Sequence, residues 1–291
     1  LTIQQYLKQI AGFSNAQIRS MKFTENGICL GGQRARVTTR LSEGDVLEVL
    51  LETKNSSSAH LLSFEQMPDI LYEDADVIAV NKPAGMAVHP SHGHYQDTLT
   101  NQLAYYFRKN TQQVEIHSIG RLDLETSGIV LFAKHRAAAA RLSRQREDGR
   151  LQKTYLAICS GIFAEKNGTL NGAIALLPGS LMKMCVSKDG KPAVTHYQVQ
   201  KQYMEAALVQ LTLETGRTHQ IRVHMADAGH PLIGDRLYFA DTDQKADVDA
   251  ENCFTGIKRA ALHASRICFY QPFEGKRITV EAPFPEDMKK C

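Results

Sequence analysis

A carboxylate in a glycine-containing loop is the first candidate for chemistry in this sequence. Asp123 lies in the string Ser118–Gly128, directly before the apolar run Ile129–Ala133, so its loop leads into a predicted strand. Functional sites are often built from such loops. Leu122 and Leu124 flank the aspartate and draw its carboxylate toward a low dielectric, where the charged form needs a nearby cation. The alternative is a turn or capping residue, the more frequent role of one loop aspartate.

A second string supplies cations that could meet such a carboxylate. Arg217, His219 and Arg222 lie in or just before a helix predicted over Thr218–Ala228. Helix N-termini attract anions, and the arginines strengthen that attraction. The anion could be a phosphate or a buried carboxylate such as Asp123. The alternative is a structural ion pair, and spacing alone does not decide between them.

An aromatic residue follows the most basic part of the chain. Tyr155 lies in the predicted strand Thr154–Cys159, where a buried tyrosine is usually a core residue with its hydroxyl satisfied. Before it, Lys134–Lys153 carries seven Lys/Arg and two acids, a local charge of +5 in a chain of net +3. Such a stretch fits a polyanion partner such as RNA, or else a solvated helix face. From it we select as RNA-binding candidates Lys134, Arg141, Arg144 and Lys153.

Metal chemistry has weaker support in the sequence. His89, His92 and His94 lie close together, but no Asp or Glu stands among them and no HExxH motif is present. The six cysteines form no CxxC pair, which argues against a thiolate zinc site. We therefore expect no metal. Scattered thiols are typical of a reduced compartment and predict a cytoplasmic protein.

Length and composition favour a globular protein that does not span a membrane. The 291 residues are 43% hydrophobic, enough for a packed core. The longest stretch without an ionised residue, Asn167–Met182, is shorter than the ~20 apolar residues that a spanning helix needs. Leu1–Ile10 contains three glutamines and a lysine where a signal peptide would be apolar, so we expect no signal peptide.

Strand signals outnumber helix signals and predict the fold class. Capping boxes place short helices near Ile3 and Asn15, and further helices are expected over Thr98–Arg108 and from Arg136 to about Arg146. Several apolar runs pair as hairpins, which favours an α+β fold with a mixed, mostly antiparallel central sheet flanked by helices and loops. The expected strands are Asp69–Tyr72, Val77–Val80, Ile129–Ala133, Thr154–Cys159, Val194–Lys201, Ala206–Leu213, Ala261–Tyr270 and Arg277–Glu281.

Six strings, taken in order, resemble the RluA-type pseudouridine synthases. They are Val80–Pro90, Arg121–Gly128, Lys153–Tyr155, Gly216–His224, His230–Asp235 and Leu262–Ala264. They spread over roughly residues 69–285, and four or more motifs in one order argue against chance. Residues 1–52 are similar to the small RNA-binding module of ribosomal small-subunit protein four, with its α/β character. The resemblance predicts this module at 1–52, a linker at 53–65 and the catalytic domain at 66–291.

The resemblance implies isomerisation of uridine to pseudouridine in RNA, without cofactor or metal. Asp123 would be the catalytic aspartate, acting on the ribose as nucleophile or as base. Arg222 would pair with Asp123 and keep it ionised, and Tyr155 would stack on the uracil and help remove the proton from carbon five. Arg121 would fill the gap left by the flipped-out base. Arg217 and His219, like the selected residues of the basic stretch, would contact RNA.

One position departs from the family pattern. The family usually has His before the Arg-Leu-Asp triplet, and here that residue is Gly120. His117 lies three residues earlier and is not assumed to replace it. The departure puts the loop conformation and the choice of target uridine in doubt.

Three alternatives stay open at the level of sequence. The RNA target is expected to be large-subunit ribosomal RNA, with transfer RNA as the alternative. A non-catalytic RNA-binding or ribosome-assembly factor of the same fold would not need Asp123, Tyr155 and Arg222 together. A metal-dependent hydrolase would need carboxylate partners for the histidine cluster. We expect a monomer that binds RNA and no membrane.

Overall fold

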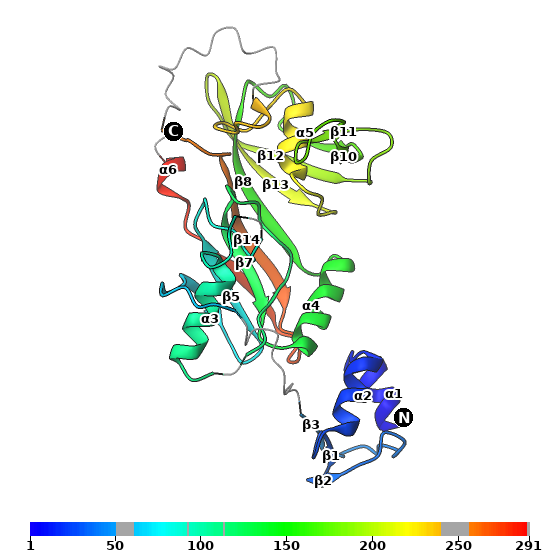
Figure 1. Ribbon diagram of the computed structural model, residues 1–291. Coiled ribbons are helices and arrows are strands. Elements are labelled where there is room, and N and C mark those ends of the chain that lie inside the picture. Colours follow the sequence, from blue (N-terminus) through cyan, green and yellow to red (C-terminus); the bar gives the residue numbers. More distant parts are fainter. Residues whose placement is uncertain (51–60, 92, 113, 240–255, 290–291) are drawn as a thin grey trace.

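A ten-stranded sheet forms the centre of the molecule (Figure 1). The computed structural model describes residues 1–50, 61–91, 93–112, 114–239 and 256–289. The strands of this sheet are β4 (Ile70–Glu73), β5 (Val77–Lys82), β6 (His117–Ser118), β7 (Ser127–Ala133), β8 (Gln152–Ser160), β9 (Asn167–Asn171), β12 (Val194–Gln202), β13 (Ala206–Leu213), β14 (Leu262–Tyr270) and β15 (Arg277–Glu281). The helices beside it are α3 (Leu99–Lys109), α4 (Arg136–Glu147), α5 (Gln220–Asp227) and α6 (Glu286–Lys289).

The strand order is β4-β5-β7-β14-β8-β13-β12-β9, with β6 paired to β7 and β15 to β14. The pair of β7 and β14 is parallel, while every other pairing in this sheet is antiparallel. The predicted mixed, mostly antiparallel sheet and the α+β class are therefore confirmed. At the parallel seam, a Cβ on Gly128 would lie 2.3 Å from the Ala264 carbonyl oxygen, so only glycine permits this approach.

The sheet separates two apolar cores, because side chains of a strand alternate between its faces. In β7, Val130 and Phe132 join the core that also holds residues of α3 and α5. Ile129 and Leu131 join the opposite core, which is covered by Ala138 and Leu142 of α4. Both faces of β7 are covered, which explains why its sequence is a continuous apolar run and does not alternate with polar residues.

The N-terminal module is a separate small unit of two helices and a three-stranded sheet. Its elements are α1 (Ile3–Gln9), α2 (Asn15–Phe23), β1 (Ile28–Leu30), β2 (Gln33–Arg34) and β3 (Leu47–Val49), with strand order β2-β1-β3. Both predicted capping boxes are present, since Thr2 and Ser14 each exchange hydrogen bonds with a glutamine three residues later. The boundary at residue 52 stays a prediction.

The module packs against α4 of the larger unit. Ala137 lies in the apolar core of the module, with Phe13 and Ile18. Arg141 Nε donates to the Ala11 carbonyl at 2.7 Å, and its Nη1 donates to the Pro272 carbonyl at 2.5 Å. The same guanidinium lies 4.1 Å from the centroid of the Phe273 ring. One side chain thus connects the module, α4 and the turn between β14 and β15.

Some sequence predictions need correction or fall outside the described residues. The helix predicted over Thr218–Ala228 begins two residues later, because His219 takes a left-handed conformation with a φ of 55°. Part of the predicted linker 53–65 is fixed, since the Leu62 carbonyl accepts a hydrogen bond from Asn101 of α3. Residues 53–60 of that linker lie outside the described residues. A small sheet of β10 (Ile174–Leu176) and β11 (Met184–Val186) was not predicted.

None of the helices that the structure describes is long and apolar enough to cross a membrane.

Candidate active site

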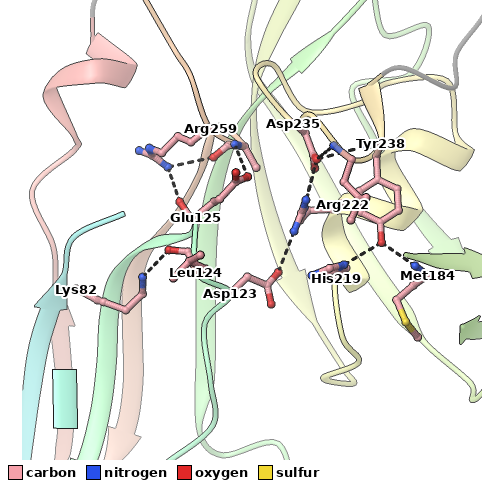
Figure 2. Close-up of polar contacts among 12 residues, drawn as sticks. Lys82, Asp123, Leu124, Glu125, Met184, His219, Arg222, Asp235, Tyr238 and Arg259 are labelled. Carbon is pink, nitrogen blue, oxygen red and sulfur yellow. Dashed lines mark hydrogen bonds and ion pairs between the residues drawn. The ribbon is translucent and has the colours of Figure 1, made fainter. Parts of the chain in front are cut away.

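The candidate site forms where the loop after β6 faces α5, as Figure 2 shows. Asp123 lies in this loop, with its side chain directed toward α5 and 31% exposed. Its carbonyl accepts a hydrogen bond from Thr126 N at 3.1 Å, which closes a tight turn. Leu122 is buried, whereas Leu124 is 42% exposed. The predicted dry surroundings of Asp123 are therefore present on one side only, and the other side is open to a substrate.

Arg222 is the cation nearest to this carboxylate, although Asp235 is its main partner. Its Nη1 lies 3.9 Å from Asp123 Oδ2, which is an ion pair but longer than a hydrogen bond. Its Nε and Nη2 donate to the two oxygens of the fully buried Asp235 at 2.7 and 2.8 Å. Such a bidentate pair fixes the guanidinium plane. Nη1 is thereby aimed at Asp123.

The charge state of Arg222 follows from these partners. Burial alone would lower its pKa, but the hydrogen bonds and charge of Asp235, together with Asp123, outweigh burial and raise the pKa of Arg222. Asp235 is held in turn by the backbone, since Oδ1 accepts from Leu237 N at 3.0 Å and from Tyr238 N at 3.3 Å. The guanidinium therefore keeps a full positive charge beside Asp123.

Tyr155 is the aromatic member of the predicted catalytic set, and it is buried. It lies on β8, as predicted, and packs in the same core as Leu122 and Ile221. Burial, with a contribution from the charge of Asp123, raises the pKa of the Tyr155 phenol. The phenol is therefore protonated at neutral pH, and its ring shares an apolar core with Leu122 of the aspartate loop.

A buried lysine supports the aspartate loop from below. Lys82 ends β5, is fully buried, and donates from Nζ to the carbonyls of Pro83 (2.9 Å), Met86 (2.8 Å) and Leu124 (3.1 Å). Leu124 is the residue after Asp123, so the lysine fixes the backbone at that point. Burial lowers the pKa of Lys82 to about 7, with the charge of Asp123 opposing this shift and that of Arg259 adding to it.

The far wall of the site comes from Tyr238 and His219. His219 Nδ1 lies 2.9 Å from the Tyr238 hydroxyl, which also accepts a hydrogen bond from Met184 N at 2.9 Å. The Arg222 guanidinium lies 5.1 Å from the centroid of the Tyr238 ring. Burial lowers the pKa of His219, so this histidine is largely neutral and packs in the wall.

Several of the cations that we predicted to contact RNA bind groups of the protein itself. Lys134 is 8% exposed and pairs with Glu73 at 2.5 Å, which does not favour the predicted RNA contact. Arg141 is bound to the Ala11 and Pro272 carbonyls, and a structural role replaces the predicted contact. Arg217 donates to the Pro192 carbonyl at 3.0 Å. Arg121 and Arg144 are exposed, and Lys153 is half-buried.

The histidines that could have suggested a metal site are directed to different partners. His89 lies 2.5 Å from the Ser118 hydroxyl and 3.0 Å from that of Thr100, while His94 pairs with Asp97. His92 lies outside the described residues. Within the described ranges no three His, Cys, Asp or Glu side chains gather as metal ligands. His117 pairs with Glu115 at 3.0 Å and does not take the place of Gly120.

Sequence reasoning missed the roles of Lys82, Asp235 and Tyr238. The first two lie inside the strings Val80–Pro90 and His230–Asp235 that carry the family resemblance. A lysine in an otherwise apolar strand end was the available signal for Lys82. For Asp235 and Tyr238 the sequence carried no signal, because their contacts with Arg222 depend on how the segment after α5 folds back onto that helix.

Comparisons with known proteins agree with this geometry. Residues 76–227 match the family model described as RNA pseudouridylate synthase. A Bacillus subtilis protein, "Uncharacterized RNA pseudouridine synthase YjbO", is 35% identical, covering 100% of this chain and 98% of that protein. "Ribosomal large subunit pseudouridine synthase D" of Haemophilus influenzae is 35% identical, covering 84% of this chain and 75% of that protein.

A solved human structure shows the same fold. "Human RNA Pseudouridylate Synthase Domain Containing 1" superposes with a TM-score of 0.58 and 27% identity, covering 79% of this chain and 86% of that one. The family model spans more than half of the chain, and the relatives extend over most of it. The chain therefore belongs to the RNA pseudouridylate synthase family and is an enzyme that isomerises uridine to pseudouridine in RNA.

Proposed function

We propose that Asp123 is the catalytic residue of this isomerase and that Arg222 and Tyr155 complete its active site. The observation that carries the proposal is the 3.9 Å ion pair between Asp123 and an arginine that is itself fixed by buried Asp235. A partly exposed carboxylate next to a fixed cation is ionised and still open to a ribose. It can act there as nucleophile or as base.

The reaction explains why the site combines a carboxylate with a buried aromatic ring. The glycosidic bond is broken, the uracil turns, and its carbon five is joined to the ribose while the hydrogen on that carbon leaves as a proton. Tyr155 offers a ring on which the detached uracil stacks. Because its phenol is protonated in the resting enzyme, stacking is favoured over proton removal as its first task.

Access to the ribose requires the uridine to leave its stack, at a cost of a few kcal/mol. Arg121 is exposed and lies two residues before Asp123, so its guanidinium can stack in the space that the base vacates. Burial first, and the positive charge of Arg121 next, lower the pKa of His89.

Large-subunit ribosomal RNA is the target that we propose, with transfer RNA as the alternative. The proposal is supported by the Haemophilus influenzae relative, whose name assigns it to the ribosomal large subunit. The similarity of residues 1–52 to a ribosomal RNA-binding module points the same way. We also propose a cytoplasmic monomer that needs no metal or cofactor, since isomerisation adds no atoms or electrons and one chain supplies the whole site.

Tritium release from RNA labelled at carbon five of uridine tests the catalytic assignment. The parent protein should release tritium from in vitro transcribed large-subunit ribosomal RNA, and Asp123→Asn should reduce the rate by about 10³-fold or more. Asp227→Asn, an exposed aspartate at the end of α5, is the matched control and should keep the parent rate.

The outcomes separate the candidate functions. Equal release by the parent and Asp123→Asn would end the catalytic role of Asp123. Binding without any release, on ribosomal and transfer RNA alike, would favour a non-catalytic factor. Release from transfer RNA but not from ribosomal RNA would change the substrate and leave the residue assignment intact.

A further inference from the structure

Gly120 leaves space for a cation at the edge of the aspartate loop. A Cβ built on Gly120, whose φ is 82°, would lie 3.7 Å from Nη1 of Arg146. Arg146 comes from the last turn of α4, so a helix on one face of the sheet reaches the loop that carries Asp123. A large side chain at position 120 would compete with this guanidinium for space.

A second cation lies close to the first. Lys153 is near the start of β8, two residues before Tyr155, and its Nζ lies 3.4 Å from the Ile129 carbonyl. Burial first, and the charge of Arg146 next, lower the pKa of Lys153 to about 8. Ile119 N donates to the Leu131 carbonyl at 2.7 Å, which places Gly120 beside the stretch of β7 whose Ile129 carbonyl the Lys153 ammonium contacts. Lys153 and Arg146 therefore both reach the part of the aspartate loop around Gly120.

Neither cation is neutralised within the part of the chain that the structure describes. No described carboxylate pairs with Arg146 or Lys153, and the acid that follows Arg146 by two residues, Asp148, is bound by Arg150 at 2.6 Å. Two like charges held together without a counter-ion repel each other, and a bound anion removes that cost. Arginine and lysine both bind phosphate well.

We infer that Arg146 and Lys153 together bind one backbone phosphate of the RNA beside the target uridine, in a site that Gly120 leaves open. The inference rests on the proposed function, because it takes the aspartate loop as the place where the uridine is held. Arg121, on the other side of Gly120, is then free to enter the stack. The phosphate contact fixes the strand, and the stacking contact stabilises the flipped state.

RNA affinity at several salt concentrations tests this site without any need for turnover. The probe is a uridine-containing hairpin transcribed from large-subunit ribosomal RNA, with Asp123→Asn as the background so that the RNA is not modified. Arg146→Gln and Lys153→Gln should each weaken binding and lower the slope of log affinity against log salt by about 1, the value for one lost phosphate contact. The double variant should lose hardly more slope than either single variant, because both side chains serve the same phosphate.

Two further variants sharpen the result. Arg150→Gln, an exposed arginine already paired with Asp148, should leave the slope unchanged. Gly120→Asn tolerates the left-handed backbone and places a side chain against Arg146, so it should lower the slope in part. An unchanged slope for Arg146→Gln, or a loss of about 2 in the double variant, would overturn the shared phosphate site. Equal tritium release by the parent and by Asp123→Asn would overturn the proposed function. It would leave the phosphate site untouched, because that site is tested by RNA affinity and not by turnover.

Discussion

At the scale of single residues, the site depends on how one arginine is divided between two carboxylates. Asp235 takes both Nε and Nη2 of Arg222 in short hydrogen bonds, while Asp123 stands 3.9 Å from Nη1. The buried aspartate therefore provides the fixed partner, and the exposed one keeps oxygen lone pairs free for the ribose. If Arg222 formed its short hydrogen bonds with Asp123 instead of Asp235, the carboxylate oxygens that have to react with the ribose would be occupied.

Asp235→Asn tests this division of tasks. The asparagine leaves the buried guanidinium without its fixed counter-charge, so Arg222 should turn toward Asp123 and occupy it. We expect tritium release to slow about tenfold or more, since small misplacements in a site are costly. The free energy of unfolding should fall by about 3 kcal/mol, as for other broken buried pairs. The turnover rate and urea unfolding measure the two effects separately.

Asp148→Asn is the matched control, because it breaks an exposed pair with Arg150. It should change neither quantity. A lower stability of Asp235→Asn with an unchanged turnover rate would restrict Asp235 to a structural role.

At the scale of elements, the sequence was most informative where side-chain periodicity was strong. The predicted strand Ala206–Leu213 coincides with β13, and α4 ends within one residue of its predicted end. The start of α5 was misplaced because the left-handed conformation of His219 depends on its contact with Tyr238. Short β10 and β11 carry little periodicity and pair only with each other.

The residues of the site also divide into those that the sequence indicated and those that depend on tertiary contacts. Asp123, Tyr155 and Arg222 were predicted from three short motifs, far apart in the chain, that carry the family resemblance, and the structure pairs Asp123 with Arg222. Lys134 was selected for its charge alone, which gave no sign of its pair with Glu73. Charge counted along a stretch does not show which cations face solvent.

The parallel seam of β7 and β14 gives a prediction about pH. His263 of β14 is buried, its Nδ1 lies 2.9 Å from the Ser127 hydroxyl, and its Nε2 has no partner among the described residues. Burial first, and the charge of Arg259 next, lower the pKa of His263 to about 4. The folded state thus binds fewer protons than the unfolded chain between pH 6.5 and 4, where an unfolded histidine is protonated.

Stability should therefore be complete above pH 6.5 and decline as the pH falls toward 4. The shift corresponds to an upper bound of about 3 kcal/mol from this one residue. His263→Gln should be less stable at pH 7.5 but lose less stability on acidification than the parent, as measured by urea unfolding at pH 7.5 and 5. His196→Gln, which changes an exposed histidine, should keep the parent's pH profile. Parallel profiles for the parent and His263→Gln would contradict the argument.

At the scale of the whole molecule, the contact between the N-terminal module and α4 orders the basic surfaces. Arg141 is half-buried, and its hydrogen bond to the Ala11 carbonyl holds the module beside α4, the helix that carries Arg144 and Arg146 (Figure 1). Cations of the module and of α4 then lie on one connected body. When an RNA binds both the module and α4, the second contact forms within a complex that already exists. It therefore costs less entropy than a contact with a separate body.

Arg141→Ala should therefore release the module without altering the catalytic residues. Loss of hydrogen bonds to the Ala11 and Pro272 carbonyls and of the Phe273 contact leaves the small packing of Ala137 as the main described link. We expect faster amide hydrogen exchange at the N-terminus of α4 and in residues 11–14, weaker RNA binding, and an unchanged maximal rate of tritium release at saturating RNA. Arg136 also lies on α4, where it pairs with Glu115, so Arg136→Ala is the control for general effects on this helix. A lower maximal rate with unchanged affinity would show instead that the contact acts through the aspartate loop, because the last turn of α4 reaches Gly120.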